Sequence, residues 1–223
     1  TLCSQNQTGS AVVTVNELPT ATISGTSDHC INTGTPQITF TATTGTAPFT
    51  FNYTLNGAAQ PSVTSPTNTY ILTAPNNTAG VFTYTLVSVT DANCTQAQTG
   101  SATITINPLP TATISGTAGV CLNDANPNII ITGANGTAPY TFVYSINTVV
   151  QPPVTTTTGN SVAIPVATTT AGPFVYELVS VTDSSSTTCS QAQTGMATIT
   201  VADAPTIVNP TPYVICDDNN DGQ

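Results

Sequence analysis

The sequence repeats itself with a long period, and this period constrains the fold more than any other feature. The string LPTATISGT occupies residues 18–26 and recurs at residues 109–117. A second segment occurs three times, as CSQNQTGSAVVTV at Cys3, CTQAQTGSATITI at Cys94 and CSQAQTGMATITV at Cys189, so its first residues are 91 and 95 positions apart. Such a period is too long for a solenoid unit and has the length of a small sandwich domain.

The phase of the repeat predicts four pieces of chain. Residues 1–16 are expected to be the C-terminal strand of a preceding repeat, 17–107 and 108–202 two complete repeats, and 203–223 the start of a following domain. The joints read NELP and NPLP, with few residues besides a proline just before the first strand. Short joints stiffened by proline favour an extended, semi-rigid string of domains.

Two strands of each repeat are legible from their alternation. Large apolar residues recur at every second position from Phe49 to Leu55 and from Tyr140 to Ile146, so one face of each strand is expected in the core. In GVFTYTLVSVTD the large residues change parity between Leu86 and Val87, and the second copy does so between Leu178 and Val179. We predict a β-bulge at this point of the strand.

About seven such strands in each repeat, separated by turn residues, describe a two-sheet antiparallel sandwich. Hydrophobic residues make up 39% of the chain, enough for a core, and its many Thr and Val residues suit a pleated sheet. The sequence therefore predicts an all-β protein of tandem immunoglobulin-like (PKD-like) antiparallel β-sandwich domains in an extended string.

The charge balance excludes several classes of partner. The chain has no Lys or Arg and ten Asp or Glu, and only 4% of its residues are charged, against about 25% in an ordinary domain. Without cations it has nothing to neutralise phosphate, so we expect neither nucleic acid nor membrane insertion. Trypsin-like proteases have no cleavage site, which suits an exposed location. The sequence shows no signal peptide and no long apolar run, and we expect it to be a piece of a longer protein.

A family resemblance rests on two motifs. GTAPFTFNYTLNG, followed some 25 residues later by AGVFTYTLVSVTDANC, resembles the PKD-like and SprB-like tandem repeats of large surface adhesins that Bacteroidota export by type IX secretion. The match covers both full repeats, but Tyr53 and Tyr144 stand near the position of a Trp in those families, and each unit is longer than a typical SprB repeat. The resemblance implies a secreted, extracellular adhesin or filament built from sandwiches.

Six cysteines occupy recurrent positions, and their pairing is open between three schemes. Bonds within a repeat would join Cys30 to Cys94 and Cys121 to Cys189. Bonds across a linker would join Cys3 to Cys30, Cys94 to Cys121, and Cys189 to Cys216. No CxxC pair suggests zinc or redox chemistry, so disulfides in an oxidising setting are the interpretation we prefer.

The third scheme joins neighbouring domains through Cys30 and Cys189, and we favour it. The two cysteine loops of one sandwich lie at opposite ends, separated by a strand of roughly 23 Å, whereas a disulfide needs Cα atoms within roughly 7 Å. Domains strung head to tail would bring the far loop of one repeat to the near loop of the next. The 13-residue stretch from Ser24 to Pro36 is long enough to keep the Cys30 to Cys94 pairing open.

Metal and catalytic chemistry have few candidates. Asp217, Asn219 and Asp221, followed by a glycine, form the first half of a calcium loop whose closing acid is missing, and an acidic turn is the alternative. We expect no other cofactor. Asp91 and Asp183 recur at strand ends and are expected to cap turns. The single histidine, His29, corresponds to Val120 in the second repeat, so no catalytic set recurs and we expect no enzyme.

The sequence thus favours a structural role. We expect a segment of a long, secreted cell-surface repeat protein that forms an adhesive fibre, stalk or filament, with neighbouring repeats and other copies of the chain as partners. The alternative is a carbohydrate-binding module, with a glycan or surface ligand, or a spacer attached to a secreted enzyme. Exposed aromatic residues would be the signature of the glycan site.

Overall fold

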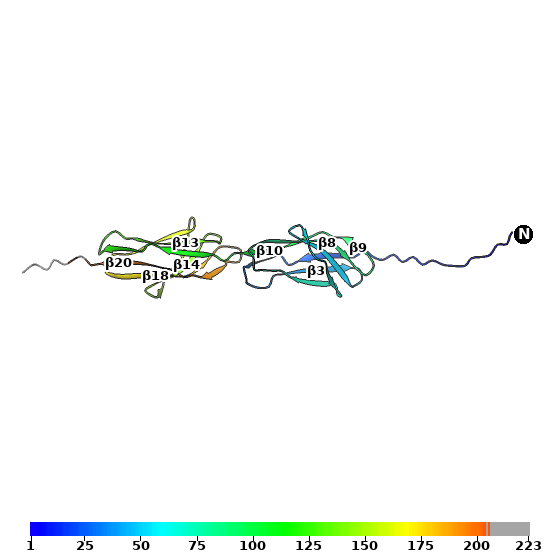
Figure 1. Cartoon of the computed structure of the whole chain (residues 1–223), viewed down its shortest axis with the longest axis horizontal. Helices are drawn as coiled ribbons and strands as arrows, with labels where there is room; N and C mark the ends of the chain where they lie inside the picture. Colours follow the sequence, from blue (N-terminus) through cyan, green and yellow to red (C-terminus); the bar gives the residue numbers. More distant parts are fainter. Residues whose placement is uncertain (204, 206–223) are drawn as a thin grey trace, which may run out of the picture. The chain divides into compact units, whose positions relative to one another are not determined.

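The computed structural model describes residues 1–203 and 205, and its elements in that range are all strands (Figure 1). The first repeat contains β1 (Thr20–Ser24), β2 (Ser27–Cys30), β3 (Gln37–Thr44), β4 (Phe49–Leu55), β5 (Ala58–Ala59), β6 (Val63–Ser65), β7 (Thr69–Thr73), β8 (Gly80–Thr90), β9 (Thr95–Ala97) and β10 (Ser101–Asn107). The second repeat contains β11 (Thr111–Ser115), β12 (Ala118–Cys121), β13 (Asn128–Ala134), β14 (Thr141–Ile146), β15 (Val149–Val150), β16 (Val154–Thr155), β17 (Ser161–Pro165), β18 (Gly172–Thr182), β19 (Ser190–Ala192) and β20 (Met196–Ala202).

Each repeat forms two sheets of its own. In the first repeat, β1-β3-β7 make a small sheet and β2-β10-β8-β4-β5 a larger one, with β6 beside β4 and β9 beside β8; the second repeat follows the same order from β11 to β20. Neighbouring strands are antiparallel except that β2 runs parallel to β10, and β12 parallel to β20. The predicted all-β, immunoglobulin-like sandwich is confirmed, with ten strands in a repeat rather than about seven. Within the described residues, no helix is long and apolar enough to cross a membrane.

The cores lie between the sheets, as the alternation predicts. In the first sandwich Phe40 packs against Phe51 and Tyr53, with ring centroids 5.6 and 5.2 Å apart, and Ile104 of β10 is fully buried beside them. The second sandwich buries the equivalent side chains: Ile129, Ile131, Phe142, Tyr144, Tyr176 and Ile199. Burying several such side chains at about 1.5–3 kcal/mol each is the main stabilising term of a domain this size.

The long strand β8 carries the predicted bulge. In its pairing with β4, Asn52 lies opposite Ser88 and Tyr53 opposite Leu86, which leaves Val87 as an extra residue. The bulge moves the buried face from Leu86 to Val89, so both are buried while Val87 is 46% exposed. The predicted change of parity is confirmed, but placing Val87 on the buried face was wrong. In β18, Val179 is exposed in the same way.

The repeated string LPTATISGT contains β1 and the short turn after it, at which the chain changes from the small sheet to the large one. β1 pairs with β3 in the small sheet, and two residues later β2 pairs with β10 in the large one. Gly25 makes the change with a φ of 115°, and a Cβ there would collide with the carbonyl oxygen of Gln37. Beyond it, the Thr26 hydroxyl accepts a hydrogen bond from the Thr103 backbone N–H at 3.1 Å. A side chain is therefore excluded at position 25, which explains why the glycine is repeated.

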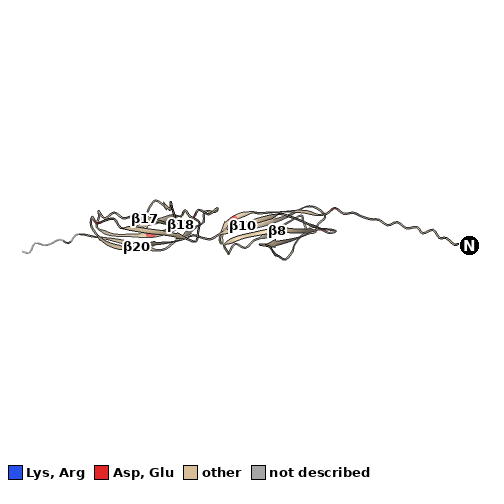
Figure 2. Cartoon of the chain, turned by 90° about the horizontal axis from the view of Figure 1, so that it is seen from above, with Lys and Arg blue, Asp and Glu red and all other residues tan. Residues whose placement is uncertain are grey.

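Hydroxyl pairs take the place of ion pairs on the surface. Acidic residues are sparse on both sandwiches (Figure 2). Threonine hydroxyls on adjacent strands instead lie within hydrogen-bond distance, as do those of Thr50 and Thr64 at 3.0 Å and of Thr141 and Thr155 at 2.9 Å. Such cross-strand pairs contribute roughly 0.2–1 kcal/mol each and, unlike ion pairs, do not weaken with salt.

The chain divides into two compact units that do not follow the sequence repeat strictly. The first unit holds residues 1–111 together with 133–140 and 181–191, and the second holds 112–132, 141–180 and the described residues from Ala192 onward. Two loops of the second repeat therefore belong to the first unit. The predicted limits 1–16, 17–107, 108–202 and 203–223 stay a prediction, and residues 204 and 206–223 lie outside the described part.

Candidate functional site

Strand β2 fixes the position of Cys30. Cys30 is the last residue of β2 and lies opposite Asn107 of β10. Backbone hydrogen bonds after Cys30 also hold the chain in place: the Ile31 N–H donates to the Asn107 carbonyl at 2.8 Å, and the Thr33 N–H donates to the Cys30 carbonyl at 3.0 Å. Cys30 is thus held at the end of the large sheet, not in the long loop that the sequence suggested.

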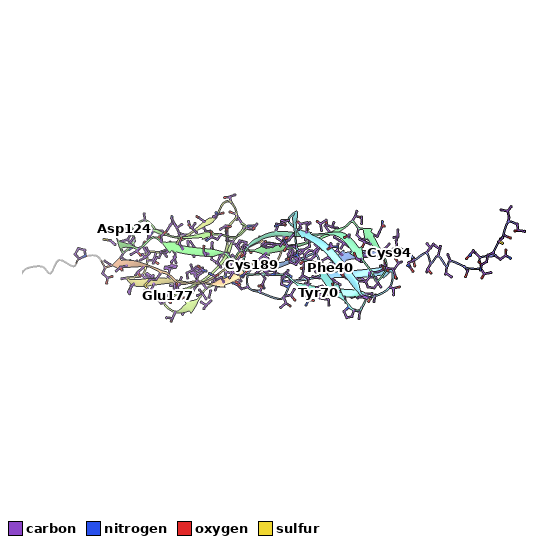
Figure 3. All side chains as sticks on the ribbon, turned by 45° about the vertical axis from the view of Figure 1, so that its right-hand side comes forward. Phe40, Tyr70, Cys94, Asp124, Glu177 and Cys189 are labelled. Carbon is purple, nitrogen blue, oxygen red and sulfur yellow. A yellow bond between two sulfur atoms is a disulfide. The ribbon has the colours of Figure 1, made fainter. Side chains whose placement is uncertain are left out.

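The loop between β18 and β19 fixes Cys189. Asp183 organises this loop: its carboxylate accepts hydrogen bonds from the Thr137 backbone N–H at 3.1 Å and the Ser185 hydroxyl at 2.7 Å. The Asp183 backbone N–H donates to the Cys189 carbonyl at 3.0 Å, and Cys189, labelled in Figure 3, is 1% exposed. Asp183 therefore caps a turn, and the cysteine is held by the backbone around that turn.

A disulfide joins Cys30 to Cys189, with Cα atoms 5.7 Å apart, and both residues belong to the first compact unit. This is the pair that we favoured from the sequence. The alternatives through Cys30 or Cys189 do not form, while Cys3, Cys94 and Cys121 are free thiols. Cys216 lies outside the described residues.

Polar side chains surround the disulfide. The Thr187 hydroxyl lies 3.2 Å from the Cys30 sulfur and 3.1 Å from the Cys189 sulfur. The Asn107 amide donates to the Ser186 and Thr187 hydroxyls at 3.2 and 3.1 Å. A hydrogen bond from Ser186, and then one from Thr105, holds the pKa of Asp28 below its ordinary value. The Cys30–Cys189 disulfide therefore lies among hydrogen-bonded polar side chains.

Sequence reasoning missed Asp28, Asn107 and Thr187. Their importance is hidden because β12 has Gly119 at the position of Asp28, and β20 has Ala202 at the position of Asn107. One signal was available: the second repeat reads DSSSTTC where the first reads DANC. The longer loop carries the hydroxyl of Thr187, which contacts both sulfurs, and that of Ser186, which contacts Asn107.

The disulfide closes a loop that contains most of both sandwiches. The sequence separation of 159 residues encloses every strand from β3 to β18. Only β1, β2, β19 and β20 lie at its ends or outside it. The covalent path from one end of the chain to the other can therefore bypass the enclosed strands through a single S–S bond.

The other candidate residues take structural positions. Asp91 accepts three backbone hydrogen bonds, from Thr46 at 2.8 Å, Asn93 at 2.8 Å and Cys94 at 2.6 Å, and these bonds lower its pKa. His29 contacts the Ser27 hydroxyl at 3.1 Å. Among residues 1–203 and 205, no group of three His, Cys, Asp or Glu could hold a metal ion. Asp217, Asn219 and Asp221 lie outside that range, so the calcium loop stays a prediction.

No family model matches the sequence, and no curated protein matches it. The I-band fragment I67–I69 of titin superposes with a TM-score of 0.58 at 13% identity, over 83% of this chain and 66% of the fragment. A three-immunoglobulin variant of the same titin domains gives 0.57 over the same shares. A Ca²⁺-stabilised adhesin with which an Antarctic bacterium reaches out and binds ice gives 0.48 at 19% identity, over 86% of this chain and 51% of its own.

This chain spans just under two thirds of the titin fragment. The likeness shows an immunoglobulin-like tandem fold and, at such low identity, nothing beyond the fold.

Proposed function

We propose that the chain is a mechanical segment of a long, secreted cell-surface repeat protein that forms an adhesive fibre, stalk or filament. The observation that carries this proposal is the disulfide between Cys30 of the first repeat and Cys189 of the second. A bond between consecutive repeats shields more of the chain under tension than a bond inside one repeat, because it removes the strands from β3 to β18 from the covalent path of the force.

The path of the force explains this protection. Tension applied to the two ends passes through β1 and β2 to Cys30, across the S–S bond to Cys189, and out through β19 and β20. The enclosed cores, such as those around Phe51 and Phe142, then carry no covalent tension. A covalent bond resists forces that break the hydrogen bonds of a strand ladder, so the enclosed strands stay folded under load.

The surface also suits an exposed fibre. Cross-strand hydroxyl pairs such as Thr50 with Thr64 need no counter-charge, and the absence of Lys and Arg removes every tryptic site. Disulfides persist in oxidising, extracellular surroundings. Together with the resemblance to PKD-like and SprB-like repeats, these features support an extracellular location, export by type IX secretion, and neighbouring repeats as the main partners.

Single-molecule stretching of the chain tests the proposal. The 159 residues behind the bond would add about 57 nm of contour length at about 3.6 Å per residue. We expect the oxidised chain to extend by about 57 nm less than the same chain after reduction, and the Cys30→Ser/Cys189→Ser variant to extend fully without reductant. Equal extension with and without reductant would contradict a mechanical role for the bond.

A carbohydrate-binding role has less support. A glycan site needs exposed aromatic faces, whereas most aromatic rings of the described residues are buried. These include Phe40, Phe51, Tyr84, Tyr140, Phe142 and Tyr176. A shallow pocket of about 350 Å³ beside Glu177 and Ser145 contains no aromatic side chain, so we do not propose it as a glycan site.

A further inference from the structure

The large sheet of the second repeat carries a row of side chains that the first repeat lacks. Residues that lie opposite each other on neighbouring strands have their side chains on the same face. The row crosses β15, β14, β18 and β20 in the order Val150, Ser145, Glu177 and Met196. The first repeat has at these positions Ala59, Thr54, Thr85 and Ser101. The second repeat therefore places a carboxylate between two large apolar side chains where the first has only small and hydroxyl-bearing residues.

We propose that this row binds a lysine side chain of a partner protein. Glu177 binds the ammonium group, and Met196 and Val150 contact the methylene stem and its apolar neighbours on the partner. The inference goes beyond the mechanical role, because it names a ligand for the surface of the segment.

Glu177, labelled in Figure 3, borders a pocket of about 350 Å³. The pocket lies beside the segment that connects β19 to β20. Backbone hydrogen bonds hold this segment against β18: the Leu178 N–H donates to the Gly195 carbonyl at 3.0 Å, and the Gln193 N–H donates to the Val179 carbonyl at 2.8 Å. The walls of the pocket are therefore fixed by the strand ladder and not by a flexible loop.

The Glu177 carboxylate has few partners of its own. The carboxylates of Asp91 and Asp183 each accept three hydrogen bonds from the turns that they cap. Within the described part of the chain, the half-buried Glu177 carboxylate accepts one, from the Ser145 hydroxyl at 3.4 Å, which is long for a hydrogen bond between two oxygen atoms. No lysine or arginine of this chain, or of another copy of it, can pair with Glu177, because the sequence has none. The cation therefore comes from a different molecule.

The surroundings of the carboxylate favour an ammonium group over other cations. A calcium ion takes six to eight oxygen ligands, whereas among the described residues no group of three His, Cys, Asp or Glu could hold a metal ion. A guanidinium binds best with both carboxylate oxygens, but Oε2 of Glu177 already accepts the Ser145 hydroxyl. The compact ammonium of lysine needs only one oxygen, and Oε1 provides it.

The apolar ends of the row suit the rest of a lysine and its neighbours. Met196 is 64% exposed and Val150 is 62% exposed. A lysine lays its methylene stem along apolar surface while its ammonium stays with polar groups, and the flexible thioether of a methionine adapts to such a stem. Four strands at a spacing of about 4.8 Å make the row about 14 Å wide. This width exceeds one side chain and therefore favours a protein surface over a small amine.

Met196 is the only methionine of the chain, so it provides a direct test. Labelled with a ¹³C-methyl group, the full chain gives one methyl signal. We expect the capped peptide Val-Lys-Val to shift this signal saturably, and the same peptide with norleucine in place of lysine to bind about fivefold more weakly. The peptide with arginine at this position, and n-butylamine, should also bind more weakly than the lysine peptide. Salt should weaken the lysine peptide, because the contact is ionic.

Glu177→Thr introduces the residue that the first repeat has at this position, and we expect it to weaken binding of the lysine peptide about fivefold. Glu17→Gln is the matched control, because it removes the same charge from an exposed position before β1; it should bind the peptide like the unchanged chain. Thermal unfolding verifies that both variants are folded, and Glu177→Gln replaces Glu177→Thr if the latter is not.

No saturable shift, or equal binding of the norleucine peptide, would overturn the site. Equal binding of the arginine peptide would overturn the choice of lysine, and equal binding of n-butylamine would overturn the protein partner. Equal weakening by Glu17→Gln would show a general attraction to an acidic chain and would also overturn the proposal. The stretching experiment does not involve Glu177 or Met196, so the mechanical role can stand if this inference fails.

Discussion

The side-chain carbonyl of Gln98 accepts a hydrogen bond from the backbone N–H of Ala21 at 3.0 Å. Its amide donates to the Pro19 carbonyl at 3.3 Å, so one side chain holds the start of the first strand. In the second repeat, Gln193 accepts from the Ala112 N–H at 2.9 Å. The segments LPTATISGT and QTG therefore contact each other in both repeats, through the glutamine side chain of QTG.

We predict that Gln98→Ala destabilises the first sandwich by about 1–2 kcal/mol, because a part-buried backbone N–H loses its acceptor. Chemical unfolding followed by tyrosine fluorescence measures this loss. The matched control is Gln60→Ala, since the Gln60 amide reaches only the carbonyl of Ala58, two residues away. Equal effects of the two variants would show that the Gln98 contact does not hold the strand.

The sequence predicted the parts of the fold that follow from alternation. The parity of Phe49, Phe51 and Tyr53 placed them in the core, where they are 4%, 0% and 8% exposed. The parity change in β8 predicted the bulge. The parity change did not show which valine protrudes from the bulge, because Val87 and Val89 are chemically identical. Only the pairing of β8 with β4 shows that Val87 is the extra residue.

The sequence did not predict the parts that depend on packing between distant segments. β2 reads SDHC and β12 reads AGVC, so no shared pattern predicts that β2 runs parallel to β10 and β12 parallel to β20. The Cys30 and Cys189 pairing needed a topological argument, and two other schemes stayed open beside it. Asn107 left no local signal because its hydrogen bond to Thr187 spans 80 positions, and the longer loop DSSSTTC was the one signal that pointed to Thr187.

Gly25 offers a second test, of the change of sheet. We predict that Gly25→Ala destabilises the first sandwich by at least about 2 kcal/mol, because its φ of 115° is strained for any L-residue and the new Cβ meets the Gln37 carbonyl. Gly119→Ala is the control, since nothing lies within 4 Å of a Cβ there; it should change stability by less than about 1 kcal/mol. Urea unfolding compares the two, and a mild Gly25→Ala effect would mean that the switch can relax.

Asp91 makes stability depend on pH. Its three backbone hydrogen bonds hold its folded pKa below the ordinary value of 3.8, so it stabilises the fold above pH 3.8, and this contribution is lost as the pH falls through the folded pKa. We predict that Asp91→Asn lowers the urea midpoint at neutral pH and flattens its decline between about pH 4 and pH 2. Asp203→Asn, at an exposed position, should leave the profile unchanged; parallel profiles for all three proteins would contradict the role of Asp91.

Gly133 and Tyr140 form a coupled pair. A Cβ on Gly133 would lie 2.6 Å from the Tyr140 ring, and the Tyr140 hydroxyl is fixed by its bond to the Gly136 carbonyl at 2.7 Å. The first repeat has Ala42 and Phe49 at these positions, both buried.

We predict that Gly133→Ala costs about 1–3 kcal/mol by overpacking. The double variant Gly133→Ala/Tyr140→Phe, which reproduces the pair of the first repeat, should cost less than the sum of the single changes, because a phenyl ring without the hydroxyl bond can shift. A thermal unfolding cycle measures the coupling, and additive effects would refute it.

Asn107 hydrogen-bonds the loop that carries Cys189. A reductant reaches the sulfur of Cys189, which is 1% exposed, only when the loop that carries Ser186 and Thr187 opens. The Asn107 amide closes this loop with two hydrogen bonds. We predict that Asn107→Ala, which reproduces Ala202 of the second repeat, speeds reduction of the bond by dithiothreitol about tenfold, as expected for hydrogen bonds worth about 1.4 kcal/mol together.

The rate of thiol release, measured in native buffer by alkylation and mass spectrometry, reports this opening. Asn52→Ala is the matched control, because it removes a similar amide bond, to Ser88 at 3.0 Å, in the strand ladder between β4 and β8. If both variants speed reduction equally, the bond is reached by unfolding of the whole sandwich. Selective acceleration by Asn107→Ala means that the loop of Cys189 opens locally while the sandwiches stay folded.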